Sequence, residues 1–132
     1  MIRPSRPRPR PGIAATEFAI ILPLLMTIIF GTIEICTMIR LGQRLNLVAY
    51  ETARVSVVPS AMQEDVDQQC ELLCDENRLQ GVTVSIDPPE FWDTDSEAWH
   101  RVTVRAPFGA NSLLGWLMPQ VWLEESVSIQ RQ

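Results

Sequence analysis

The chain has 132 residues, of which 46% are hydrophobic, and a formal net charge of −5. This length leaves room for one small domain beside a hydrophobic segment and is too short for a large enzyme with an extended pocket. The charge is uneven: residues 1–12 carry four arginines and no acid, whereas the remainder carries seven arginines and sixteen acids. The leader alternates Arg and Pro without aromatic residues on which bases could stack, so we expect no nucleic-acid partner.

A long apolar run, residues 13–39, follows this basic leader directly. As a helix it would be roughly 40 Å long, against roughly 30 Å of bilayer hydrocarbon. Arginines just before a span favour the cytoplasmic side for that end. We therefore expect a single-pass protein of the cytoplasmic membrane whose leader is cytoplasmic and whose C-terminal part lies outside. A secretory signal is cut after its apolar stretch, but here the small residue Gly12 precedes the stretch, which predicts that the stretch is kept.

The helical pattern continues beyond the membrane. Aliphatic residues recur at spacings of three and four over residues 41–55, between polar and charged residues. We expect one helix from residue 13 to about residue 57, ended by Pro59. Residues 13–58 would then form a transmembrane helix with an amphipathic extension.

The remaining residues, 59–132, predict a small exported α+β head. Ser60 and Gln63 have the spacing of a capping box, and Gly81 would end the helix that they begin. We expect one face of this second helix to be buried, with members Met62, Val66, Cys70 and Leu73.

Three segments of the head alternate between apolar and polar residues, as half-buried strands do: 82–86, 102–106 and 121–129. Glu125 breaks the apolar phase of the last one. Residues 113–118 predict one or two helical turns closed by Pro119. The fold class is therefore α+β, with a long N-terminal helix, a second short helix and a small antiparallel sheet of about three strands.

The junction at Gly12 and the motifs behind it resemble a known family. Cleavage after a glycine, with a glutamate (Glu17) at the fifth mature position, is the pattern of type IV prepilin-like proteins. Glu-Phe-Ala at 17–19, Leu-Pro at 22–23, Gly-x-x-Glu at 31–34 and Ala-x-x-x-Ala-Arg at 49–54 follow in order. This succession, over about residues 10–58, resembles the TadE-like pseudopilins of tight-adherence (Flp) pilus systems.

The resemblance implies that a prepilin peptidase cuts between Gly12 and Ile13. It also implies a minor, pilin-like subunit that works with other pilin-like subunits and the pilus assembly machinery. A carboxylate within hydrocarbon is costly and usually has a partner. Glu17 would pair with the new α-amine of Ile13 from a neighbouring subunit, or would be an unpaired acid near the membrane interface.

Four further motif residues would serve helix packing or partner contact: Pro23, Gly31, Glu34 and Arg54. Of these, Glu34 lies near the outer end of the span, one and a half turns before Arg40. The alternative for Glu34 is therefore an acid that is tolerated because water or headgroups solvate it.

Cys70 and Cys74 lie four residues apart on the predicted second helix. Their Cα atoms would be about 6 Å apart, which permits a disulfide, although helical Cβ directions would strain it. A disulfide within the chain, one between chains and a reduced pair all remain open. We expect no zinc site, because this pair with His100, the one histidine, lacks the ligand count.

Two further groups of side chains have simpler expectations. The acids Asp87, Glu90, Asp93, Asp95 and Glu97 lack the spacing of a calcium loop, so we expect a solvated acidic surface. The tryptophans at 92, 99, 116 and 122 are expected in the core of the head or at the membrane surface.

No nucleophile stands at a recognisable spacing from a base, and no phosphate loop or metal cluster is visible. We expect no catalytic site, no cofactor and no small-molecule substrate. Two other functions compete with the pseudopilin of a tight-adherence pilus. One is a minor pseudopilin of a type II secretion system. The other is a signal-anchored binding or sensor domain, which would retain residues 1–12.

Overall fold

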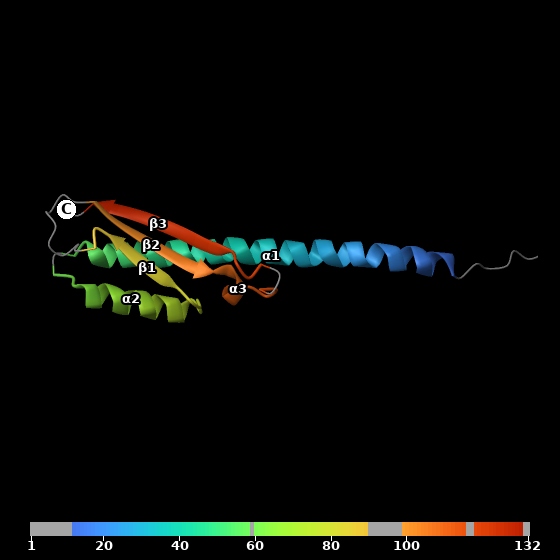
Figure 1. Cartoon of the computed structure of the whole chain (residues 1–132), viewed down its shortest axis with the longest axis horizontal. Coiled ribbons are helices and arrows are strands. Elements are labelled where there is room, and N and C mark those ends of the chain that lie inside the picture. The colour runs from blue at the N-terminus through green and yellow to red at the C-terminus, as the bar shows by residue number, and fades with distance from the viewer. Residues whose placement is uncertain (1–11, 59, 90–98, 116–117, 131–132) are drawn as a thin grey trace, which may run out of the picture. The chain divides into compact units, whose positions relative to one another are not determined.

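The computed structural model describes residues 12–58, 60–89, 99–115 and 118–130. Its elements are α1 (Ile13–Ser56), α2 (Gln63–Glu76), β1 (Thr83–Asp87), β2 (Trp99–Pro107), α3 (Phe108–Asn111) and β3 (Trp122–Gln130) (Figure 1). The predicted α+β class is confirmed, with a long first helix, a second short helix and three antiparallel strands. The chain divides into two compact units, Met1–Ile33 and Glu34–Gln132, and the boundary falls within α1.

In the first unit, every described residue of α1 is exposed, from Ile13 to Ile33. Within the described ranges, α1 is the one helix that is long and apolar enough to cross a membrane. Its exposed stretch in this unit would be roughly 31 Å long at 1.5 Å per residue, close to the thickness of bilayer hydrocarbon. Three threonine hydroxyls bond back to helix carbonyls at 2.8 Å: Thr16 to Ile13, Thr27 to Pro23 and Thr32 to Ile28. These hydroxyls therefore need no water, as a lipid-facing helix requires.

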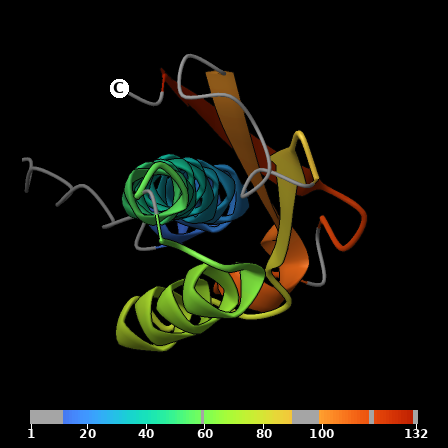
Figure 2. The same cartoon turned by 90° about the vertical axis from the view of Figure 1, so that its left-hand side faces the viewer.

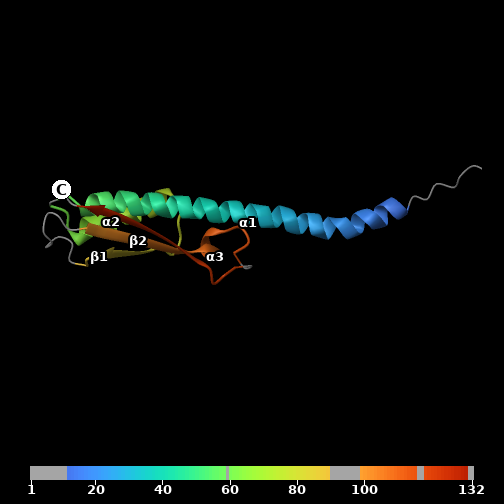
Figure 3. The same ribbon diagram turned by 90° about the horizontal axis from the view of Figure 1, so that it is seen from above.

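From here on we call the second unit, Glu34–Gln132, the head, which therefore includes the C-terminal part of α1 as well as residues 59–132. It is built on a sheet of order β1-β2-β3 in which both pairs are antiparallel. The part of α1 that belongs to the head and α2 lie on the same side of this sheet (Figure 2). Strands β2 and β3 run alongside that part of α1 (Figure 3). The core forms between these layers, and its fully buried members include Leu45, Val48, Val102, Val104 and Phe108.

The predicted periodicity of α1 beyond residue 40 is confirmed, because Leu41, Leu45, Val48 and Thr52 are all buried. Alternation in β2 also matches its burial: His100, Val102, Val104 and Ala106 are buried. In β3, Glu125 pairs with the buried Val104 of β2. It therefore occupies one of the apolar positions of the strand, as the sequence indicated. A Cβ at Gly42 would stand 3.6 Å from Oε1 of Glu125, so this carboxylate faces α1 where the helix has no side chain.

The predicted start of the second helix is wrong. The cap residue is Met62 rather than Ser60, and its backbone N–H donates to the Asp65 carboxylate at 2.9 Å. Asp65 stands three residues after Met62 and so supplies the reciprocal half of a capping box. Met62 itself is 69% exposed and does not belong to the buried face of α2, whereas Val66 and Cys70 do.

The predicted end of this helix at Gly81 is also wrong. Helix α2 ends at Glu76, and the N–H of Leu79 donates to the Cys74 carbonyl across Arg78, which has φ 54°. A left-handed residue with this hydrogen bond is the usual end of an α-helix, although glycine is the common residue there. Gly81, with φ 67°, instead forms the turn before β1.

The helical turn near the C-terminus lies earlier than predicted, at Phe108–Asn111 instead of residues 113–118. Residues 113–115 form turns, and 116–117 lie outside the described residues. A Cβ on Gly115 would collide with the backbone carbonyl of Gly109, so this turn packs directly on α3. The absence of a side chain at Gly115 permits that close approach.

The two tryptophans in the described part of the head do not lie in its core, which was one of the two places expected for them. Trp99 is 63% exposed and Trp122 is 59% exposed. Both stand on the outward phase of their strands, since the neighbouring inward positions of β2 are the buried ones. Trp92 and Trp116 lie outside the residues whose placement can be described.

Candidate functional sites

The predicted processing site lies where α1 begins. Gly12 precedes the first helical residue, Ile13, and its carbonyl already accepts the N–H of Thr16 at 3.2 Å. Gly12 is exposed, and a Cβ built on it would meet no atom within 4 Å. Nothing in the described structure therefore requires glycine for packing at this position.

Glu17 is exposed one helical turn after Ile13. Helical side chains lean towards the N-terminus, so residues four apart share a face. No ion pair to Glu17 is found within the described part of the chain. Its carboxylate is therefore free to meet a cation near the start of the helix.

Pro23 and Gly31 are exposed within the first unit. A Cβ on Gly31 would meet nothing within 4 Å, so the chain itself leaves this position open. The proline lies inside the helix and lacks the N–H that would complete the preceding turn. Neither residue is explained by packing among the described residues.

Glu34, the first residue of the head, is not solvated. It is 4% exposed, and neither carboxylate oxygen has a hydrogen-bond partner within the described ranges. The alternative of an interfacial acid kept in water or headgroups is therefore wrong for this fold. Burial without a partner costs a carboxylate several kcal/mol, by order of magnitude.

Arg54 lies at the other end of the family-like motifs and is exposed. Its Nη1 atom stands 4.0 Å from Oε2 of Glu51, and the Arg54 side chain is 74% exposed. Exposed pairs of this kind contribute at most about 1 kcal/mol. No hydrogen bond or ion pair found among the described residues joins Glu17, Glu34 and Arg54 to one another.

Cys70 and Cys74 are brought together on α2, as their spacing predicts. Their sulfurs are 3.8 Å apart, and both are free thiols in the structure. The hydrogen bond with Cys74 lowers the pKa of the Cys70 thiol, against the opposing effect of burial. The same hydrogen bond, together with burial, raises the pKa of the Cys74 thiol. Their oxidation to a disulfide stays a prediction.

The acidic segment is described only at Asp87, which ends β1. Glu90, Asp93, Asp95 and Glu97 lie outside the described residues, so the expected solvated acidic surface remains a prediction. No group of three or more potential ligands that could hold a metal ion is found in the described part of the chain.

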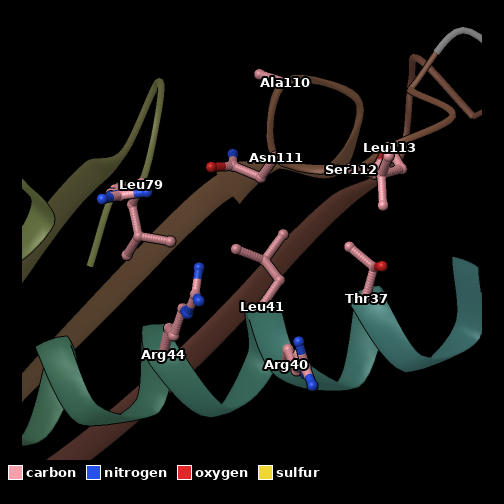
Figure 4. A pocket seen from close by; sticks show the side chains of 10 residues that line it. Thr37, Arg40, Leu41, Arg44, Leu79, Ala110, Asn111, Ser112 and Leu113 are labelled. Atoms are coloured by element: carbon pink, nitrogen blue, oxygen red, sulfur yellow. The ribbon is translucent and has the colours of Figure 1, made fainter. Parts of the chain in front are cut away.

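Sequence reasoning missed a cavity of about 540 Å³ in the head. Three arginines line it, Arg40 and Arg44 from α1 and Arg78 from the end of α2. Figure 4 shows Arg40 and Arg44 on successive turns of α1, below Leu79 and below Asn111 at the end of α3. The two helical arginines could have been paired from their spacing, but nothing local in the sequence places Arg78 beside them.

Residues 12–54 match the family model described as TadE-like protein. This segment is TadE-like. The resemblance drawn from the motifs is thereby confirmed, over about a third of the chain. The TadE-like segment contains every predicted processing and partner-contact residue from Gly12 to Arg54, and it ends before α2 and the sheet. No curated protein and no solved structure matches the chain.

Proposed function

We propose that this protein is a membrane-anchored pseudopilin, a minor pilin-like subunit of a tight-adherence (Flp) pilus assembly system. We further propose that a prepilin peptidase cleaves it between Gly12 and Ile13. The observation that supports this most strongly is that two boundaries fall together at Gly12. The TadE-like segment begins at Gly12, and α1 begins one residue later with an exposed apolar stretch.

The Gly12–Ile13 bond lies at the N-terminal end of α1 and not within the helix. A protease binds its substrate as extended chain, and the end of a helix opens more readily than its interior. Glycine lets the enzyme approach the backbone closely, because there is no Cβ to obstruct it. The open surroundings of Gly12 support a requirement set by the protease rather than by the fold.

Cleavage would create a cation one turn from an acid. The new α-amine of Ile13 would be positive, and Glu17 shares its helical face. A neighbouring subunit's amine would neutralise Glu17 within the membrane, where an unpaired carboxylate is costly. The amine of the same chain is the competing partner, and the recruitment experiment below separates the two.

Contacts with other pilin-like helices are proposed for the exposed face at Pro23 and Gly31. Close helix approach in a membrane favours small residues such as glycine. The open surroundings of Gly31 support contact with another subunit, whereas Glu34, which is 4% exposed, is proposed for helix packing within the head. We place the leader in the cytoplasm and the head outside the cytoplasmic membrane, in line with the arginines of residues 1–12.

We propose that the protein is a substrate of one enzyme and not itself an enzyme. Its one histidine, His100, is fully buried on the inner side of β2, where it cannot reach a substrate. The proposed partners are the membrane, the prepilin peptidase, other pilin-like subunits and the assembly machinery.

Co-expression with a prepilin peptidase of a tight-adherence system tests the processing. Intact mass should fall by the mass of residues 1–12, and N-terminal sequencing should begin at Ile13. Gly12→Val should abolish the change. Gly31→Val is the matched control, because it adds the same side chain to an open helical glycine and should leave cleavage intact. A chain that keeps Met1 beside the active peptidase would support the signal-anchored domain instead.

Recruitment is tested separately with Glu17→Gln. This variant should be cleaved normally but should co-purify less with the pilus machinery, because the amide cannot neutralise a neighbour's amine. Glu64→Gln, at an exposed acid of α2, is the control. Unchanged co-purification of the Glu17 variant would exclude the pairing with a neighbour and favour pairing within the chain.

A further inference from the structure

The cavity between α1, α2 and α3 has an unusual charge for this protein. Beyond the leader the chain carries seven arginines and sixteen acids, yet of the described residues three arginines and no acid line this one cavity. We propose that Arg40, Arg44 and Arg78 bind the phosphate of an anionic phospholipid headgroup in the outer leaflet of the cytoplasmic membrane. This inference rests on the membrane anchoring in the proposed function, but not on cleavage or on pilus assembly.

The three arginines are not neutralised within the described chain. Elsewhere in the head, Arg105 pairs with Glu124 at 2.8 Å and Arg54 stands 4.0 Å from Glu51. Arg44 instead donates from Nη1 to the backbone carbonyl of Asn77 at 3.2 Å, and no ion pair to a cavity arginine is found among the described residues. Guanidinium groups that have no carboxylate partner are well suited to a phosphate, which they bind through paired hydrogen bonds.

The Asn111 amide holds the cavity in shape, because all of its hydrogen bonds go to the backbone around it. Asn111 donates to the carbonyls of Gln80 and Pro107, both at 2.9 Å, and accepts the N–H of Gln80 at 2.8 Å. This tie joins α3 to the connection between α2 and β1. The adjacent Ser112 also lines the cavity, and its hydroxyl is buried without a hydrogen-bond partner within the described ranges.

Arg78 occupies a backbone conformation that arginine adopts reluctantly. Its φ of 54° is left-handed, at the position after a helix where glycine is the common residue. The fold would be satisfied by glycine, so its own requirements do not explain this side chain. Binding of an anion does explain it, because the left-handed residue carries the third guanidinium to the cavity.

The place of the cavity along the chain selects a lipid among possible anions. Arg40 directly follows Ile39, the last of the exposed aliphatic residues of the span. The headgroup layer begins where such a run ends. Leu41 and Leu79 line the same cavity, as does Leu113, which is 78% exposed. Apolar side chains beside guanidinium groups fit a phosphate with an attached diacylglycerol better than a free ion.

The test uses the full, uncleaved chain in detergent, with thermal unfolding of the head as its readout. Phosphatidylglycerol should raise the melting temperature, whereas phosphatidylcholine and inorganic phosphate at the same concentration should not. An equal shift with inorganic phosphate would overturn the assignment to a lipid. An equal shift with phosphatidylcholine would overturn the assignment to an anionic headgroup.

Variants separate binding from folding. Arg78→Gly relieves the left-handed strain, so without lipid it should be at least as stable as the parent chain. It should nevertheless bind phosphatidylglycerol about tenfold more weakly, as the loss of one charged hydrogen bond implies. Arg101→Gln, on the outward face of β2, and Arg8→Gln, in the leader, should keep the full response.

A full lipid response in Arg78→Gly would refute the site. Because the assay needs neither peptidase nor pilus, a chain that is never cleaved can still show this lipid response. Conversely, a correctly cleaved chain that lacks the response would refute the lipid site alone.

Discussion

Replacing Glu34 with methionine should stabilise the head. Glu34 is 4% exposed, and both of its oxygens lack partners within the described residues. An unsatisfied buried polar group costs about 1–3 kcal/mol, and more when it is charged. Methionine has a similar unbranched shape and no group that needs hydrogen bonds. Replacing buried charge by apolar side chains of similar volume has gained about 1–4 kcal/mol in other proteins, and we expect a gain within that range.

Thermal unfolding of the full chain in detergent, followed by circular dichroism, measures this gain. The head has about 100 residues, so each kcal/mol should move the melting temperature by about 4–8 °C. Glu34→Gln removes the charge but keeps two polar groups, and should gain less than Glu34→Met. Glu71→Met, at an exposed position of α2, is the control and should change stability by about 0.5 kcal/mol or less.

A lower melting temperature for Glu34→Met would refute this reasoning, because it would mean that the carboxylate is satisfied in the folded head. The same variant also tests whether Glu34 contacts a partner. Because the head itself encloses Glu34, the methionine variant should co-purify with the pilus machinery as fully as the parent chain. A loss of co-purification would show that Glu34 does contact another subunit.

Four other changes test the packing and the thiol pair. Gly42→Ala should stabilise the head by about 1 kcal/mol in thermal unfolding, because its Cβ would make ordinary contacts with β3 and alanine favours helix. Gly115→Ala should destabilise it by about 1–3 kcal/mol in the same assay, because its Cβ would collide with the backbone of α3. Leu45→Ala, at a fully buried position, should cost about 2–5 kcal/mol in denaturant unfolding. Cys74→Ala removes the hydrogen bond that lowers the pKa of Cys70. In a background where Cys36, the remaining cysteine, is replaced by alanine, the ultraviolet absorbance of the thiolate should therefore appear at higher pH than in the parent chain.

The elements that could be predicted from the sequence are those fixed by a long repeating pattern. Spacings of three and four from Leu41 onwards predicted the buried face of α1. Alternation at Val102, Val104 and Ala106 predicted the inward phase of β2. The start of α2 is different, because Ser60 and Met62 each have a hydrogen-bonding side chain three residues later, at Gln63 and Asp65. Local sequence does not decide between two such caps, and the structure uses the carboxylate.

For the tryptophans, the size of the apolar ring predicts burial wrongly, whereas the position in the alternating pattern of the strand predicts exposure correctly. Trp99 was expected in the core for its large apolar ring, yet it shares the outward face of β2 with Arg101 and Thr103. The alternating pattern already placed it there, since Val102 and Val104 occupy the opposite phase. A consistent alternation over a whole strand therefore outweighs the hydrophobicity of one residue. Its exposure leaves the other expectation for the tryptophans, contact with the membrane surface, as the one still to be tested.

Near the start of the head, an acid and two arginines of α1 do not pair with each other, and helix geometry gives the reason. Among the described residues Glu34 is buried without a cation, while Arg40 and Arg44 line a cavity to which none of these residues contributes an acid. Six residues separate Glu34 from Arg40, and at 3.6 residues per turn this places them on different faces of α1. A self-sufficient domain would gain by pairing such charges. The arginines line a cavity that a ligand can enter, and the proposed lipid phosphate would neutralise them there. Glu34 is enclosed by the head itself, so replacing it should stabilise the fold without the loss of a ligand.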